Sequence, residues 1–116
     1  MSVGASGNEA RPELLLFDAL GRRWAMRILW ELRGGALAFN EIRRRCGLMS
    51  TSVLSRRLGE LGEMGLAGHD DFGSWELTAT GRAVGEALTT LAGLAPEVLS
   101  GEGAGPGEGS ALPSRA

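Results

Sequence analysis

The sequence predicts an α+β fold that is mostly helical, and three features of residues 11–100 support this prediction. Apolar residues recur at helical spacing in several segments, which is the pattern of helices with one buried face. Two short helical segments flank a glycine turn at Gly47. Two strand-like runs then surround the turn-forming residues 70–73. This order predicts a winged helix-turn-helix with extra N- and C-terminal helices.

The two ends of the chain differ in composition from the middle. Residues 1–10 are small and polar, and residues 101–116 contain five glycines and two prolines. Segments of this kind cannot bury enough apolar surface to offset the entropy lost on ordering. We therefore predict a disordered N-terminus over 1–10, one folded domain over 11–100 and a disordered tail over 101–116.

The first two predicted helices cover residues 12–20 and 22–32. Pro12 suits a first helical turn, and Leu14–Phe17 make the first helix apolar on nearly all sides. Such a helix needs cover from several directions, and a partner subunit is a natural source in a small domain. The second helix repeats apolar residues at four-residue spacing, namely Trp24, Ile28 and Leu32.

The helix-turn-helix itself is predicted from caps and a turn. After a short strand at 37–39, Asn40 is expected to cap a helix over 41–46, and Gly47 to adopt a left-handed backbone. Ser50 is expected to cap a second helix that runs to Met64. Its buried stripe is predicted at i, i+4 and i+7, at Leu54, Leu58 and Leu61.

The rest of the domain is predicted as a hairpin and a last helix. Residues 66–69 and 74–77 are the expected strands. Thr78 or Thr80 is expected to cap the last helix, and Pro96 to end or kink it. One face of that helix carries Val84, Leu88, Leu91 and Leu94.

Charge is distributed unevenly along a chain whose net charge is only −2. Residues 22–57 hold nine arginines against two glutamates, a local charge of +7. Residues 58–116 hold nine acidic residues against two arginines. Local potential steers a polyanion such as DNA, whatever the total charge. The alternative is that these charged faces are simply solvated.

The predicted helix-turn-helix and hairpin, residues 41–77, contain the residue types that contact DNA. Arginine side chains hold phosphates, whereas hydroxyl groups and arginine can also read base edges. We expect DNA base contacts from Thr51, Ser52, Ser55 and Arg56. We expect phosphate contacts from Arg44, Arg45, Ser50, Arg57 and His69. The alternatives are an ion pair between Arg56 and Glu60 and a plain surface position for His69.

Other chemistry finds little support in the sequence. Cys46 is expected to be a small buried hydrophobe, with a redox thiol as the alternative because nearby arginines could lower its pKa. One cysteine cannot form an internal disulfide.

His69 lacks partners at metal-ligand spacing, so we expect no metal and no cofactor. No nucleophile pairs with a histidine and an acid, so we expect no enzyme activity. No apolar run is long enough to predict a membrane span.

Three stretches, in order, resemble the HxlR-type winged helix-turn-helix regulators, a bacterial group related to the MarR-like proteins. LGRRWAMRILWEL resembles the family's Gly-Gly-Lys-Trp helix, with Trp24 at its tryptophan. FNEIRRRCGLMSTSVLSRRLGELGEMGL resembles its Phe-x-Glu-Leu and Ser-x-x-x-Leu-x-x-x-Leu region. WELTATGR resembles its Tyr-x-Leu-Thr-x-x-Gly after the wing. The chain departs from it at Arg11-Pro12, where many members carry Cys-Pro, and at Ala38, where Arg is frequent.

The resemblance implies a homodimer paired through its terminal helices, with Ser50–Met64 as the recognition helix. We therefore expect a cytoplasmic, sequence-specific transcriptional regulator, and we expect it to be a repressor rather than an activator. Its expected partners are duplex DNA with a palindromic operator, a second copy of the chain, and a small-molecule effector of unknown identity. The alternative is a winged helix used for protein–protein contact, whose basic face binds an acidic partner.

Overall fold

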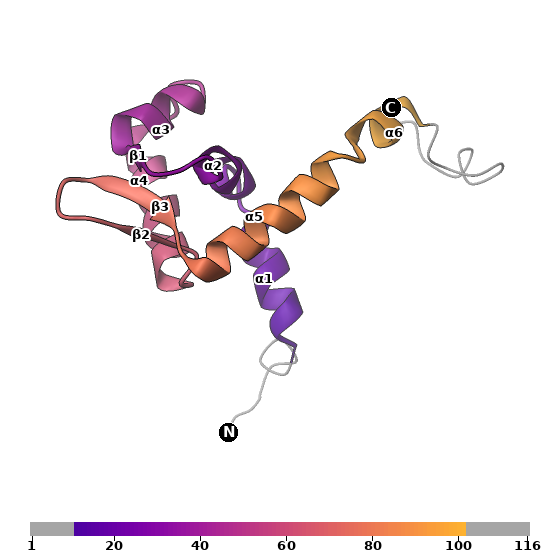
Figure 1. The fold of residues 1–116 in the computed structure, drawn as a ribbon, viewed down its shortest axis with the longest axis horizontal. Helices are drawn as coiled ribbons and strands as arrows, with labels where there is room; N and C mark the ends of the chain where they lie inside the picture. The colour runs from indigo at the N-terminus through magenta and orange to yellow at the C-terminus, as the bar shows by residue number, and fades with distance from the viewer. Residues whose placement is uncertain (1–10, 102–116) are drawn as a thin grey trace. The chain divides into compact units, whose positions relative to one another are not determined.

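The computed structural model describes residues 11–101, so the disorder predicted for 1–10 and 101–116 lies outside the described residues except at Gly101, which follows the last helix. The described chain is mostly helical and contains three short strands (Figure 1). Their order is α1 (Pro12–Leu20), α2 (Ala25–Leu32), β1 (Leu37–Ala38), α3 (Phe39–Arg45), α4 (Thr51–Glu63), β2 (Ala67–His69), β3 (Ser74–Leu77), α5 (Ala79–Ala92) and α6 (Ala95–Ser100). This order is that of a winged helix-turn-helix with extra terminal helices, as predicted.

The contacts divide the chain into two compact units, one ending at Gly85 and one starting at Glu86, so the boundary falls within α5. The first unit contains α1 to α4 and the three strands. All the predicted site residues belong to it. None of the helices within residues 11–101 combines the length and the apolarity that a bilayer crossing requires.

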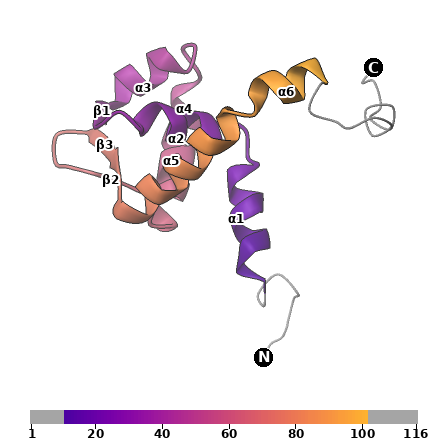
Figure 2. The ribbon, with the colours of Figure 1, turned by 45° about the vertical axis from the view of Figure 1, so that its right-hand side comes forward.

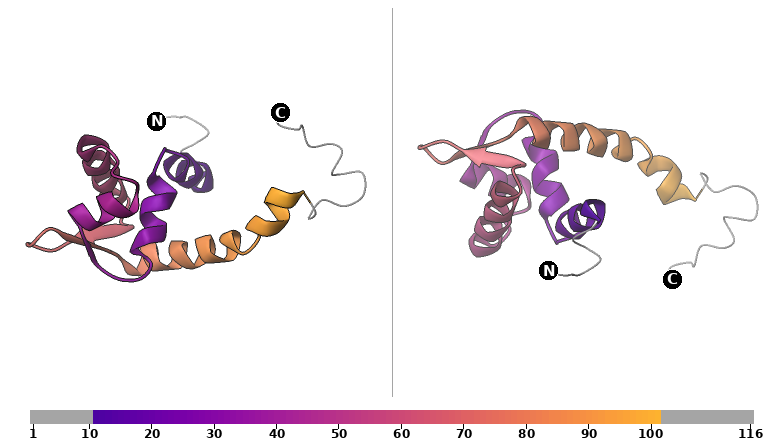
Figure 3. Two further views of the ribbon diagram at one scale, coloured as in Figure 1. Left: turned by 90° about the horizontal axis from the view of Figure 1, so that it is seen from above. Right: turned by 90° about the horizontal axis from the view of Figure 1, so that it is seen from below.

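A three-stranded antiparallel sheet lies in the first unit, with the strand order β1-β3-β2. Leu37 of β1 pairs with Trp75 of β3, and Ala67 of β2 pairs with Leu77 of β3. Strands β2 and β3 form the predicted hairpin, and its tip extends beyond the neighbouring helices (Figures 2 and 3). β1 therefore adds a third strand, and its pairing of Ala38 with Ser74 places the start of α3 beside the N-terminal end of β3.

The core of the first unit is apolar and comes mainly from α2, α3 and α4. The stripe predicted on α4 is confirmed, because Leu54, Leu58 and Leu61 are all buried. Burying such a side chain contributes about 1.5–3 kcal/mol relative to leaving it exposed. The other fully covered side chains in this core are Ile28, Leu29, Leu32, Ile42 and Cys46.

Two predicted helix starts are wrong. Helix α2 begins at Ala25 rather than at Arg22, because Trp24 has a left-handed backbone with φ of 78°. A helix cannot continue through that conformation, which is also strained for a residue with a side chain. Asn40 does not cap α3; the cap is Ala38, whose side chain makes no hydrogen bond, and Asn40 lies inside the helix.

The connection from α4 to α5 depends on a close approach of two backbones. Helix α4 ends at Glu63, and Gly65 follows with φ of 75°. Thr78 caps the last helix, as one of the two predicted alternatives, because its Oγ1 accepts the Gly81 N–H at 3.0 Å. A Cβ at Gly81 would collide with the Leu66 carbonyl. The glycine of the WELTATGR stretch is therefore required by packing.

Pro96 does not lie within α5. Helix α5 ends at Ala92, and a separate short helix, α6, starts at Ala95 with the proline in its first turn. Of the face predicted on the last helix, Leu91 and Leu94 are about half exposed. Val98 and Leu99 of α6 are more exposed still. The second unit thus presents apolar side chains that the described chain leaves uncovered.

Candidate nucleic-acid interface

A tight turn joins α3 to α4 and sets the direction of the second helix. Helix α3 ends in a Schellman motif, in which Leu48 N–H donates to the Arg43 carbonyl at 2.8 Å. Gly47 has φ of 74°, as predicted, and Leu48 has φ of 62°. The Arg43 Nε also donates to the Met49 carbonyl at 2.7 Å. The partly buried Arg43 therefore holds the backbone that leads into α4.

Ser50 caps α4, as predicted. Its backbone is extended, and its Oγ accepts the Val53 N–H at 3.2 Å. The hydroxyl oxygens of Ser50 and Ser52 lie 3.0 Å apart. The N–H groups of a first helical turn lack intrahelical acceptors and carry the positive end of the helix dipole. This end of α4 is therefore suited to an anion.

The outward face of α4, which we define as Thr51, Ser52, Ser55 and Arg56, lies opposite the buried leucines. All four residues are exposed. Within residues 11–101, the side chains of Thr51, Ser55 and Arg56 have no hydrogen-bond or ion-pair partner. The ion pair considered for Arg56 is not formed, because Glu60 pairs with Arg22 and Arg57 instead. The predicted base-contact residues therefore share one accessible surface.

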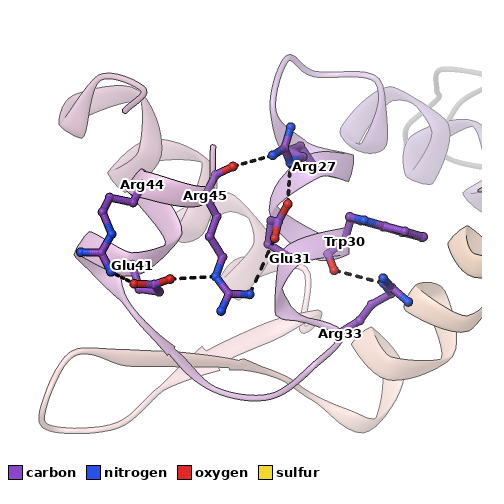
Figure 4. Close-up of polar contacts among 7 residues, drawn as sticks. All are labelled: Arg27, Trp30, Glu31, Arg33, Glu41, Arg44 and Arg45. Carbon is purple, nitrogen blue, oxygen red and sulfur yellow. Dashed lines mark hydrogen bonds and ion pairs between the residues drawn. The ribbon is translucent and has the colours of Figure 1, made fainter. Parts of the chain in front are cut away.

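Arg44 and Arg45 extend from α3 beside carboxylates (Figure 4). Glu41 pairs with Arg44 and, at 2.9 Å, with the Arg45 Nε. The Arg45 Nη1 lies 3.8 Å from Glu31 Oε1 on α2. Both arginine side chains remain well exposed, at 63% and 45%. Solvent therefore screens these pairs, and each is expected to contribute little to stability.

Arg27 and Glu31 of α2 complete this group, although neither residue was among the predicted contact residues. Arg27 Nε lies 2.7 Å from Glu31 Oε2, and its Nη2 donates to the Arg45 carbonyl (Figure 4). These contacts join α2 to the C-terminal end of α3. The i,i+4 spacing of Arg27 and Glu31 was a visible signal. The Arg45 carbonyl, to which Arg27 donates, is distant in sequence, and no sequence signal indicated that contact.

Arg57, predicted as a phosphate contact, has several partners within the protein. Its Nε donates to the Arg23 carbonyl at 2.8 Å, and its Nη1 donates to Glu60 Oε1 at 3.2 Å. The same Glu60 oxygen lies 3.3 Å from Arg22 Nη1. The Arg57 side chain is only 16% exposed. Arg57 therefore lies on the inner side of α4, apart from the outward face.

The tip of the wing is closed by Asp70. Its Oδ1 accepts the N–H groups of Phe72 at 2.8 Å and Ser74 at 3.0 Å. The hydrogen bond from Ser74, followed by that from Phe72, holds the pKa of the Asp70 carboxyl below its usual value. His69, the remaining phosphate candidate, is exposed, and its ring centroid lies 4.7 Å from that of Trp75.

Cys46 is buried at the end of α3, as expected for a small hydrophobic residue. Burial raises the pKa of the thiol, and the charge of Arg27 only partly opposes this effect. A raised pKa disfavours the thiolate, which is the reactive form. Within the described residues, no three histidine, cysteine or acidic side chains gather as metal ligands.

The three tryptophans lie in different surroundings. Trp75 and His69 border an open groove of about 460 Å³ between α4 and the wing, together with Gly59, Gly62, Glu63, Ala67 and Gly68. Trp30 is covered by the Arg33 guanidinium, which lies 3.4 Å from its ring centroid. The Arg23 guanidinium lies 5.4 Å from the ring of Trp24. Both are cation–π contacts.

A family model described as HxlR-like helix-turn-helix matches residues 19–102 of the chain. The match includes the turn, the outward face of α4 and the wing. No curated protein matches the sequence.

Several solved structures are similar to this one. Quinone-bound YodB from B. subtilis is 25% identical, with a TM-score of 0.70 over 75% of this chain and 97% of that chain. A protein described as a possible HxlR family transcriptional factor from Thermoplasma volcanium GSS1 is 28% identical, with a TM-score of 0.65 over 72% and 80%. The transcriptional repressor BigR from Xylella fastidiosa is 22% identical, with a TM-score of 0.62 over 73% and 87%. At that identity, BigR shows a common fold only.

Proposed function

The chain belongs to the HxlR-like helix-turn-helix family, whose members are transcriptional regulators and not enzymes, and we propose that it is a homodimeric repressor. In this proposal Ser50–Met64 is the recognition helix and reads a palindromic operator in duplex DNA. Repression would follow from occlusion of a promoter. A regulator of this kind acts where the DNA lies, so we propose a cytoplasmic location.

The observation that carries the proposal is the outward face of α4. Helix α4 buries three leucines on one side, and on the other it leaves Thr51, Ser55 and Arg56 exposed and without partners among residues 11–101. An unpaired guanidinium can donate two parallel hydrogen bonds to guanine, and hydroxyl groups can contact either base of a pair. A helix of these dimensions fits the major groove.

Phosphate contacts are assigned first to Arg44 and Arg45. Each would exchange a screened contact with a carboxylate for one with a phosphate, at a cost below about 1 kcal/mol. Ser50 and the start of α4 provide backbone donors for another phosphate. His69 remains a candidate at the wing. The partly buried Arg57, also predicted from the sequence as a phosphate contact, is not included in this assignment, because its guanidinium already has partners in the protein.

The dimer is proposed from apolar side chains at both ends of the described chain. Leu15 and Phe17 of α1 are 47% and 60% exposed. In the second unit Leu91, Leu94, Val98 and Leu99 are also exposed. Apolar patches of this kind are typical of surfaces that another protein covers. A second copy with two-fold symmetry would place the two recognition helices about 34–36 Å apart, one turn of DNA.

An effector would shift the spacing or angle of the two recognition helices. YodB has been crystallised with a quinone bound. In this chain the single cysteine is buried and its pKa is raised by burial. We therefore propose that a small-molecule effector of this protein binds without forming a bond to a cysteine.

Selection of bound fragments from random duplex DNA tests the proposal, followed by titration of the enriched duplex. We expect enrichment of a palindrome, two chains per duplex, and log K falling with log salt by about 0.9 per phosphate contact. Absence of enrichment would contradict the proposal. Tighter binding of an acidic polypeptide than of any duplex would support the protein–protein alternative instead.

A further inference from the structure

Four residues join the recognition helix to the turn between α1 and α2. We call them the clasp: Arg22, Arg23, Arg57 and Glu60. Arg57 links the Arg23 carbonyl to the Glu60 carboxylate, and the same carboxylate pairs with Arg22. A side chain of α4 therefore contacts the backbone of the turn, and a side chain of the turn contacts a carboxylate of α4. The two elements are far apart in sequence.

Burial separates Arg57 from the arginines assigned to phosphate. Its side chain is 16% exposed, against 45% for Arg45 and 63% for Arg44. Glu60 is also largely covered, at 28%. A partly buried charge is costly to leave without a partner, because it has already lost much of its water. Arg57 is thus better placed to hold the protein together than to leave its partners for DNA.

The carbonyl that Arg57 holds belongs to the residue before Trp24, which has a strained backbone. Trp24 adopts φ of 78°, a conformation that a residue with a large side chain keeps only where its surroundings hold it. Trp24 also caps α2, so the peptide between Arg23 and Trp24 sets how α1 leads into α2. Arg57 fastens that peptide to α4.

We propose that Arg57 and Glu60 are positioning residues, which fix the direction of the recognition helix relative to α1. The inference rests on the proposed function, because α1 carries part of the proposed dimer surface. In a dimer, the direction of each recognition helix decides which half-site spacing both helices can reach together. The clasp would therefore determine the operator spacing that the protein accepts, without contacting DNA.

A measurement without DNA tests the clasp itself. Arg57→Gln retains a side-chain N–H donor group but removes the charge and the guanidinium. We expect amide hydrogen exchange in the turn at residues 21–25 to become about tenfold faster, as the loss of a hydrogen bond from a charged donor implies. Arg56→Gln, the same change on the outward face, should leave exchange in this turn unchanged. Equal exchange in both variants would overturn the inference.

A measurement with DNA tests what the clasp does. The duplex enriched from random DNA is compared with duplexes whose half-sites are one or two base pairs closer or farther apart. We expect Arg57→Gln and Glu60→Gln to lose the preference among spacings while the salt slope of the full chain stays unchanged. A phosphate contact from Arg57 would instead lower the slope by about 0.9 and leave the spacing preference intact. That result would overturn the inference.

The two measurements keep the inference distinct from the proposed function. Glu60→Gln removes the charge that pairs with Arg22 and Arg57 but keeps a side chain of the same size, so it provides a second variant in which the fold is less disturbed. A wild-type chain that binds DNA without a spacing preference would contradict the proposed dimer. In that case, or if no DNA is bound, the exchange rates of the turn alone would decide whether the clasp exists.

Discussion

The two faces of α4 differ in almost every physical respect, although they belong to the same thirteen residues. Leu54, Leu58 and Leu61 are 0%, 1% and 2% exposed. On the opposite side, Thr51, Ser55 and Arg56 are exposed and have no partner among the described residues. One face of α4 therefore stabilises the fold, and the opposite face is the one proposed to contact DNA. Substitutions on the two faces should therefore change different measured quantities.

The largest effect is expected on the inner face. Leu58→Ala removes a fully buried side chain and should lower the free energy of unfolding by about 2–5 kcal/mol, measured by urea denaturation. Ser55→Ala is the matched control on the outward face and should change it by less than about 0.5 kcal/mol. Similar losses in both variants would mean that the outward face also supports the fold.

Arg56→Ala should give the next largest effect. We expect it in the discrimination between DNA sequences and not in the stability of the fold. We expect a loss of about 1–3 kcal/mol of discrimination at one base position per half-site, with an unchanged unfolding transition. The measurement compares the selected duplex with its single-base variants. Arg45→Ala is the control, because a lost phosphate contact should weaken all sequences alike. Uniform losses from both variants would show that Arg56 does not read a base.

Ser50 lies at the border of the two faces, so its effect should be smaller and shared. Ser50→Ala removes the acceptor for the Val53 N–H, and caps of this kind contribute about 1 kcal/mol to stability. Thermal unfolding should report that loss. Ser52→Ala, a change in the neighbouring hydroxyl that caps nothing, should leave the unfolding temperature nearly unchanged. The cap assignment would be wrong if Ser52→Ala cost as much.

The smallest effect is expected at the wing, which is separate from both faces of α4. The pKa of Asp70 is lower in the folded chain than its ordinary value of 3.8. Its charge therefore stabilises the fold above that value, and the stabilisation is lost as the pH falls through the folded pKa. Asp70→Asn should remove this part of the acid dependence of unfolding. Asp71→Asn should retain it, and identical pH profiles for both variants would contradict the assignment.

Local signals were sufficient to predict most of the first unit. Proline, serine and glycine predicted the start of α1, the cap of α4 and the left-handed turn, because the physics of each lies within a few residues. The leucine stripe of α4 followed from its spacing. Asn40 failed as a cap because β1 pairs with β3, and this pairing ends the extended backbone at Ala38 and starts α3 one residue before Asn40.

The sequence pattern could not predict contacts between segments that are distant in the chain. Arg56 and Arg57 are adjacent and identical in type, yet Arg56 has no partner in the described part of the chain, whereas Arg57 donates to the Arg23 carbonyl 34 residues away. Arg27 reaches the Arg45 carbonyl in the same way. Only the tertiary arrangement distinguishes an arginine available to DNA from one occupied within the protein. The assignment of individual DNA contacts therefore stays a prediction.

Cross-linking from the outward face tests the central claim most directly. Cys46 is the single cysteine of the chain and is 1% exposed, so a thiol introduced by Ser55→Cys can be labelled selectively with a photoreactive group. We expect that label to cross-link to bases at one position in each half-site of the selected duplex, whereas a label at Asp18→Cys on α1 reaches no base. Cross-links to bases from position 18 and none from position 55, in a chain that still binds the duplex, would contradict the account.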